Sequence, residues 1–139
     1  MTMAEYDKFR PEVPPLHEPF WAALRDHRLE LQRCDNCSSL RFIPSEICHH
    51  CGSTAATWTA VPGKGAVYTY TVVRRAPTPA YQADVPYVIV HVTLDEGPRM
   101  ISTMVDCEPD DVEIGMRVEV TYDDVADDLT LYRFRPAAP

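Results

Sequence analysis

The stretch CDNCSSLRFIPSEICHHC, residues 34–51, contains four cysteines in two C-x-x-C pairs that are separated by ten residues. Two thiolates three residues apart on a tight turn point at one centre. Two such turns complete a tetrahedral site with metal–sulfur distances of about 2.3 Å. The segment between the pairs suits a short hairpin that bends at Pro44. The spacing therefore predicts a metal-binding ribbon whose ligands are Cys34, Cys37, Cys48 and Cys51.

Other uses of paired cysteines fit this sequence less well. Disulfides are typical of secreted proteins, and a redox C-x-x-C pair usually accompanies a βαβ pattern that this chain lacks. Iron would use the same spacing as zinc, and we favour zinc because nothing else in the sequence indicates electron transfer. Four protein thiolates leave no position open for water or substrate, so we expect the metal to be structural.

Three further residues bear on the metal prediction. His49 and His50 lie within the second cysteine pair and could compete as ligands, but the cysteine spacing is already complete. We therefore expect both histidines to be solvated. The fifth cysteine, Cys107, ends an alternating segment and is expected to be a small buried apolar residue.

Length, composition and charge limit the class of protein. The chain has 139 residues, of which 45% are hydrophobic, enough for one domain or two small units that share a core. The formal net charge is −8, and residues 66–139 carry thirteen acidic and six basic residues. This acidic field disfavours a nucleic-acid partner. The chain lacks a run of about 18 apolar residues and an apolar leader, so we expect a cytoplasmic protein without a membrane segment.

The remaining pattern predicts a mainly β protein. Pro19 and the apolar spacing after it predict a short helix that ends near residue 27, followed by a strand over LELQR, residues 29–33. After the ribbon, five segments have strand character, and in residues 86–94 Val88, Val90, Val92 and Leu94 share one face. Five strands with a helical connector between the third and fourth predict a closed barrel of the OB type; a sandwich is the alternative.

This order of motifs closely resembles a family long catalogued as "domain of unknown function 35". The resemblance covers residues 17–135 and includes FWAAL (20–24), LQRC (31–34), the four cysteines, GKGAVYTYTVV (63–73), LDEG (94–97) and DDVEIGMRVEV (110–120). It implies an N-terminal extension and helix at 1–27, a rubredoxin-like zinc ribbon at 28–60, a five-stranded OB-fold barrel at 61–135 and a tail at 136–139. The family often has glycine where this chain has His27 and Ser38, and proline where it has His49. These differences affect the expected geometry of the turns and not the expected fold.

The resemblance also implies a function. Members of the family resemble accessory subunits of thiolase-like enzymes that act on coenzyme A thioesters, including thiolases, acyltransferases and retro-aldolases that shorten steroid side chains. It implies a thiolase-fold catalytic partner in a two-plus-two complex, with acyl-CoA as the ligand of the complex. The sequence itself contains neither a glycine-rich phosphate loop nor a serine nucleophile motif. This lack agrees with a non-catalytic subunit.

The segment RRAPTPAYQADVP, residues 74–86, is a candidate for contact with acyl-CoA or the partner. Its prolines make it stiff, and Tyr81 offers an aromatic surface. Arginine forks suit the phosphates of coenzyme A, which makes Arg74 and Arg75 candidates. The alternative is a solvated surface loop.

Three other residues are candidates for the same contacts. His91 lies in the middle of a predicted strand, opposite the valine face, and is expected to face outward or toward a partner. Phe20 and Trp21 either fasten the helix to the barrel, which we favour, or form part of a partner surface.

Two functions of other classes remain as alternatives. A single-stranded nucleic-acid-binding OB module could stack bases on Tyr68, Tyr70 and Tyr132, although the barrel half of the chain is acidic. An electron carrier could hold iron at the four thiolates.

Overall fold

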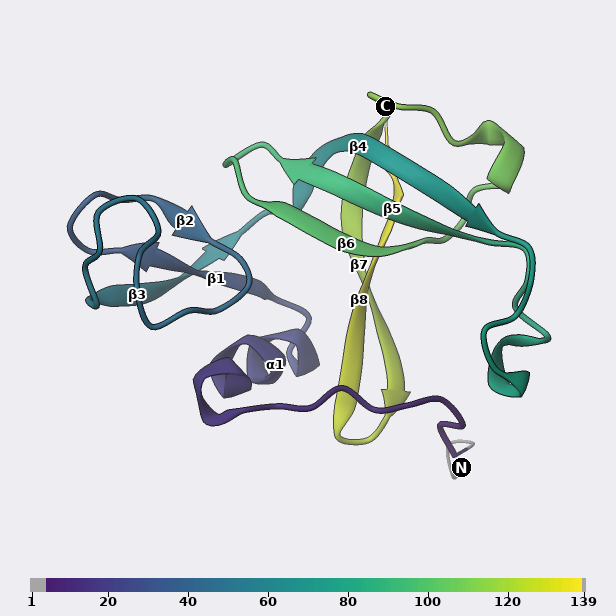
Figure 1. Ribbon diagram of the computed structural model, residues 1–139, viewed down its shortest axis with the longest axis horizontal. Helices are drawn as coiled ribbons and strands as arrows, with labels where there is room; N and C mark the ends of the chain where they lie inside the picture. The colour runs from purple at the N-terminus through teal and green to yellow at the C-terminus, as the bar shows by residue number, and fades with distance from the viewer. Residues whose placement is uncertain (1–4, 139) are drawn as a thin grey trace.

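Eight strands and one short α-helix make up residues 5–138, the part of the chain that the computed structural model describes (Figure 1). Residues 1–4 of the predicted extension and residue 139 of the predicted tail lie outside the described residues. In chain order the elements are η1 (Pro15–His17), α1 (Glu18–Arg25), β1 (Leu29–Cys34), β2 (Leu40–Arg41), β3 (Ala56–Val61), β4 (Lys64–Val73), η2 (Pro79–Tyr81), β5 (Tyr87–Leu94), β6 (Arg99–Met104), η3 (Pro109–Asp111), β7 (Arg117–Ala126) and β8 (Leu129–Pro136).

Helix α1 begins one residue before Pro19, which occupies the first turn, where its missing N–H group is not needed. The helix ends at Arg25, slightly earlier than the predicted end near residue 27. The backbone of His27 has a φ of 58°, in the left-handed region, and its N–H donates to the carbonyl of Leu24 at 2.9 Å. A left-handed residue is a common way to end a helix, usually with glycine.

The ribbon is a three-stranded antiparallel sheet in the order β2-β1-β3. Its central strand pairs Gln32 with Arg41 on one side and Leu29 with Val61 on the other. Strand β3 is not among the predicted strands, and only short segments of the sequence separate it from the second cysteine pair and from β4. Pairing with β1 along six residues supplies the hydrogen bonds that make it a strand.

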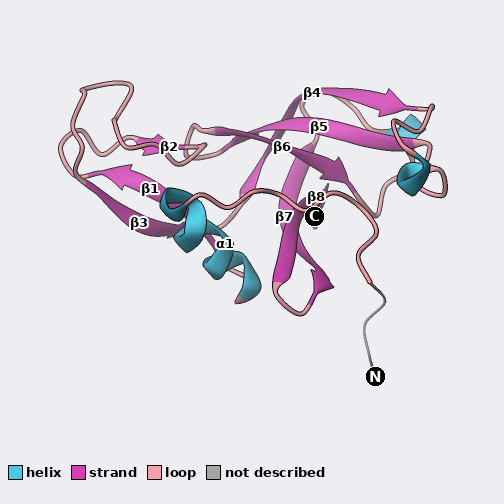
Figure 2. Ribbon diagram, turned by 60° about the horizontal axis from the view of Figure 1, so that its bottom comes forward, coloured by secondary structure: helices cyan, strands magenta, loops and turns pink. Residues whose placement is uncertain are grey.

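The second sheet closes into a barrel in the order β4-β5-β6-β8-β7 (Figure 2). The ends of the sheet meet where β4 pairs with β7, at Gly65 and Val118, and β6 lies parallel to β8 at Met104 and Phe134. The predicted five-stranded OB-type barrel is confirmed, and the sandwich alternative is wrong.

Alternation decides which side of each barrel strand is buried. On β5 the predicted face is at most 2% exposed and consists of Val88, Val90, Val92 and Leu94. On β6 the core side is taken by Met100 and Met104, whereas Ile101 points outward and is 56% exposed. Cys107 is half-buried rather than buried, because it lies in the loop that follows β6.

Helix, ribbon and barrel share one hydrophobic core. Leu24 of α1 and Leu31 of β1 are buried together with barrel residues such as Phe134. The Phe20 ring lies 5.5 Å from the ring of Phe42 in the ribbon and 5.9 Å from that of Tyr132 on β8. This aromatic group joins all three parts. Among residues 5–138, no helix has the length and apolar character needed to cross a membrane.

Candidate metal centre

The two cysteine pairs form two turns with the same backbone pattern. In the first, the N–H of Ser38 donates to the carbonyl of Cys34 at 2.9 Å, and in the second, Gly52 donates to Cys48 at 2.8 Å. In each turn the N–H of the first cysteine also donates to the carbonyl five residues later. Both turns end in the left-handed region, with φ of 65° at Ser38 and 77° at Gly52. The serine at position 38 therefore adopts the conformation for which glycine is better suited.

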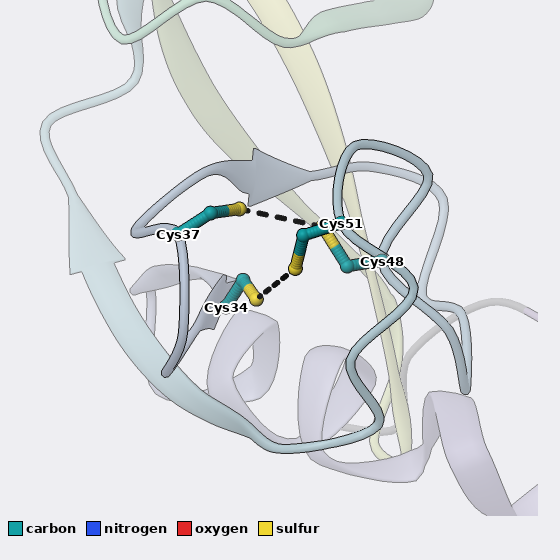
Figure 3. A group of neighbouring side chains, drawn as sticks. All are labelled: Cys34, Cys37, Cys48 and Cys51. Atoms are coloured by element: carbon teal, nitrogen blue, oxygen red, sulfur yellow. Dashed lines mark hydrogen bonds between the residues drawn. The ribbon is translucent and has the colours of Figure 1, made fainter.

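The four sulfur atoms converge on one point between the turns (Figure 3). Cys34 Sγ lies 3.5 Å from Cys51 Sγ, and Cys37 Sγ lies 3.6 Å from Cys48 Sγ. All four sulfur atoms lie within 4.8 Å of one another. A tetrahedron with metal–sulfur distances of about 2.3 Å has sulfur–sulfur edges of about 3.8 Å. The predicted ligand set is thus brought together around one point, and two of its sulfur–sulfur distances are close to that edge.

The electrostatics of the cluster favour a bound cation. The pKa of Cys37 is lowered to about 6, mainly by a hydrogen bond with the Ser39 hydroxyl, whose Oγ lies 3.2 Å from Cys37 Sγ. The pKa of Cys34 is lowered mainly by a hydrogen bond from the backbone N–H of Cys37. The Asn36 side chain lowers the pKa of Cys51, but burial and the neighbouring thiols outweigh it, and that pKa is raised. Neighbouring thiolates repel one another, so complete ionisation requires a positive ion between them.

Both histidines of the second turn are outside the metal cluster. His49 and His50 are exposed, and their ring centroids lie 4.4 Å apart. The residues that converge are the four cysteines. The expectation that these histidines are solvated agrees with their exposure.

Two buried polar side chains hold the loop between the cysteine pairs. Ser45 N–H donates to Gln32 Oε1 at 2.7 Å, and Arg41 Nη1 donates to the Ser45 carbonyl at 2.9 Å. Gln32 and Arg41 are 6% and 3% exposed and are paired across β1 and β2. Their role does not follow from the sequence, because polar residues such as glutamine and arginine are usually exposed.

The candidate contact segment after β4, residues 74–86, has two exposed arginines at its start and a half-buried tyrosine further along. Arg74 and Arg75 are exposed. Tyr81 is half-buried: its ring lies 5.8 Å from that of Tyr87, and the ammonium group of Lys8 lies 5.2 Å from its centroid. The N-terminal segment of the same chain therefore already occupies one side of Tyr81.

The other three candidates lie on different elements. His91 has its ring 5.6 Å from Tyr68, in an edge-to-face arrangement, and the Arg99 guanidinium lies 3.8 Å from the centroid of Tyr68. Phe20 is buried, and Trp21 packs against the core with its ring 5.5 Å from Phe20. The packing favours the fastening role for these two residues. The six candidate contact residues thus do not form a single group.

Two family models match the chain over most of its length. Residues 21–56 match the model described as ChsH2, rubredoxin-like zinc ribbon domain. Residues 58–123 match the model described as ChsH2, C-terminal OB-fold domain. The first range includes β1 and β2 and ends where β3 begins, and the second begins within β3 and continues through β4, β5, β6 and most of β7.

Similar proteins carry names of subunits and scaffolds. A "DUF35 domain-containing scaffold protein" of Methanocaldococcus jannaschii is 40% identical over 75% of this chain and 78% of its own length. A "Probable enoyl-CoA hydratase alpha subunit" of Thermomonospora curvata is 41% identical over 86% of this chain. This chain spans only 37% of that hydratase subunit.

A solved structure has the same fold over nearly the whole chain. It is described as "Ltp2-ChsH2(DUF35) aldolase", and it matches with a TM-score of 0.84 and 38% sequence identity. The match covers 93% of this chain and 100% of the other.

Proposed function

This chain belongs to the ChsH2 family of DUF35 proteins, and from that premise we propose that it is a zinc-binding, non-catalytic accessory subunit of an enzyme that acts on acyl-CoA thioesters. The observation that carries the proposal is the convergence of four cysteine sulfurs into a closed cluster. Such a cluster gives the chain a structural cross-link and no coordination position for a substrate. The catalytic residues then come from another chain.

Zinc at this cluster has a mechanical role in the proposal. The ligands come from two separate turns, and β2 is only two residues long. Small units with little core commonly need a metal or a disulfide for stability. Zinc, when bound, supplies that cross-link. The chain's own groups prepare the site: the Ser39 hydroxyl and the N–H of Cys37 favour the thiolate forms of the ligands.

We further propose that the partner is a thiolase-fold catalytic subunit and that two copies of each chain assemble. The similar solved structure is named as an aldolase, and the similar archaeal protein is named as a scaffold. The reaction of the whole complex is carbon–carbon bond cleavage or formation on an acyl-CoA. In this proposal the exposed Arg74 and Arg75 lie near the acyl-CoA entrance and bind its phosphates.

Co-expression tests the assembly. We expect the chain to co-purify with a thiolase-like protein encoded beside it, at a mass that corresponds to two copies of each. The partner should lose activity when this chain is removed. Thioester turnover by this chain alone, or full activity of the partner without it, contradicts the proposal.

A pair of matched variants tests the acyl-CoA contact separately. Replacing Arg74 and Arg75 with alanine should raise KM for acyl-CoA about tenfold in the complex and leave assembly unchanged, since each lost phosphate contact removes a charge-assisted hydrogen bond. The control is Arg28→Ala, which removes an exposed arginine that pairs with Asp26 at 3.2 Å. Equal KM values for the two variants would contradict the proposed role of Arg74 and Arg75, but they would not bear on the proposed assembly with a partner.

Single-stranded nucleic-acid binding is the weaker alternative. OB barrels with zinc ribbons serve this function in other proteins, but they need a basic surface. Residues 66–139 carry thirteen acidic and six basic residues. Tight binding of a single strand in a gel-shift assay at low salt would favour the alternative.

A further inference from the structure

Residues 5–10, here called the strap, have no regular secondary structure and bend at Lys8; the N-terminal segment passes the β7–β8 hairpin on its way to α1 (Figure 1). Burial alternates along the strap: Tyr6 and Lys8 are half-buried, whereas Asp7 and Phe9 between and after them are exposed. The Lys8 side chain is 19% exposed, and Phe9 is 84% exposed. One edge of the strap therefore faces the barrel, and the Phe9 side chain faces solvent.

Two ion pairs fasten the strap at separate places. Lys8 Nζ lies 3.1 Å from Asp84 Oδ2, and the same ammonium group lies over the Tyr81 ring. Arg10 Nη2 donates to Asp128 Oδ1 at 2.8 Å. Asp84 belongs to the connection between β4 and β5, and Asp128 belongs to the turn between β7 and β8. The strap thus joins two connections that are distant in sequence.

These two connections have a defined place in the OB fold. The barrel consists of five strands, β4 to β8, so they are the connections between the first and second and between the fourth and fifth strands. In OB folds these two connections flank the face that binds extended ligands. The strap contacts both of these connections, and we call its contact residues Tyr81, Asp84 and Asp128 the strap site.

We propose that the strap site is a docking site for an extended basic peptide segment of a partner protein, with cationic side chains two residues apart, and that the strap competes with that segment. The charges argue for this partner, because carboxylates stand at both ends of the site and an aromatic ring lies beneath one cation. An acidic site repels a polyanion and attracts a polycation.

The strap is held weakly enough to be displaced. Arg10 and Asp128 are 48% and 77% exposed, and exposed ion pairs contribute about 0–1 kcal/mol each. Phe9 adds no burial at the site. The strap has the advantage of attachment, since a short tether gives an effective concentration of roughly millimolar. A partner segment with comparable contacts must overcome that concentration.

The test uses the full chain with its own strap repelled. In the variant K8E/R10E the strap carries negative charges, which Asp84 and Asp128 repel. The probe is a fluorescent, end-capped peptide of residues 8–11, KFRP, whose charged side chains are the two cations. We expect this peptide to bind the variant more tightly than the wild-type chain in anisotropy measurements at low salt. Adding Asp84→Asn and Asp128→Asn to the variant should abolish binding.

Two controls keep the test decisive. A peptide in which both cations are replaced by glutamate should not bind. Equal binding of the KFRP probe to wild-type and variant chains, or binding that survives removal of both carboxylates, overturns the proposal. The test requires no acyl-CoA enzyme, so its failure leaves the proposed function untouched.

Trypsin provides a second measurement on the otherwise unchanged chain. The Lys8–Phe9 bond is cleavable, and it is protected while Lys8 is bound at the strap site. Asp84→Asn should increase its cleavage rate several-fold. Asp110→Asn, which changes an exposed acidic residue outside the strap site, should leave the rate unchanged. Equal rates in the two variants overturn the proposal.

Discussion

The Nε2 atom of His27 lies 3.0 Å from both carboxylate oxygens of Asp124, and this pair links the end of α1 to strand β7. The His27 ring also stacks on Tyr122, with centroids 5.1 Å apart and an angle of 15° between the planes. Thr130 Oγ1 donates to the same carboxylate at 2.6 Å. A histidine in a left-handed position, where the resemblance suggests glycine, thus has side-chain contacts that offset its backbone strain.

Asp124 should make stability depend on acid pH. The Thr130 hydroxyl, and then His27, lower the pKa of Asp124 below its ordinary 3.8. A carboxyl group whose pKa is lowered by folding stabilises the protein above its ordinary pKa, and this contribution is lost as pH falls through the lowered value. Asp124→Asn should therefore reduce the free energy of unfolding at pH 7 but change it little at about pH 2. Urea unfolding of both proteins at both pH values measures this. If the wild type and the variant differ by the same free energy of unfolding at pH 7 and at about pH 2, the prediction is wrong.

The same site predicts a contrast between two substitutions. Asp124→Ala leaves the buried hydroxyl of Thr130, which is 3% exposed, without its acceptor. We expect a loss of about 1–2 kcal/mol in the free energy of unfolding at pH 7. Asp124→Asn retains an acceptor oxygen and should cost less. Equal losses for the two variants would show that the hydroxyl contributes nothing.

Gly65→Ala should destabilise the barrel strongly. A Cβ at position 65 would collide with the carbonyl oxygen of Thr93 and lie 3.0 Å from Leu94 Cα, and backbone atoms cannot move aside cheaply. We expect a loss of about 3 kcal/mol. The control is Gly115→Ala, where the added Cβ meets open space and only the φ of +89° is strained, at a cost of about 1 kcal/mol. Similar melting temperatures for the two variants would contradict the prediction.

Cys48→Ser should remove the metal and destabilise the ribbon. Metal analysis of the wild-type chain should give one zinc per chain, and a colourless protein argues against iron. The variant should hold less than a tenth of that zinc and unfold about 10 °C lower, which corresponds to about 3 kcal/mol for a chain of this size. Cys107→Ser, which changes the half-buried cysteine outside the cluster, should keep the full zinc content. Full zinc in the Cys48→Ser variant would refute the ligand assignment.

Phe20→Ala should separate the parts that the aromatic group joins. The Phe20 side chain is 3% exposed and contacts rings from both ribbon and barrel. We expect a loss of about 3–5 kcal/mol in the free energy of unfolding. Phe9→Ala makes the same change at a residue that is 84% exposed, and it should alter stability by less than about 0.5 kcal/mol. A small effect at Phe20 would contradict the fastening role.

The sequence alone determined the features that depend on nearby residues. The C-x-x-C spacing predicts two turns because the cysteines of each pair are three residues apart, and the turns form as predicted. Alternation predicted the inward face of β5, since side chains of a strand point to opposite sides. The resemblance implied the order of helix, ribbon and barrel in the same way, from motifs along the chain.

Only the tertiary structure decided how distant segments meet. It made residues 56–61 a strand by pairing them with β1, and it turned Met100 rather than Ile101 toward the core. It brought Lys8 to Asp84, a contact between segments 76 residues apart. Periodicity indicates which residues share a side of one element. Contacts between elements depend on barrel closure, which places the β4–β5 and β7–β8 connections beside the same strap.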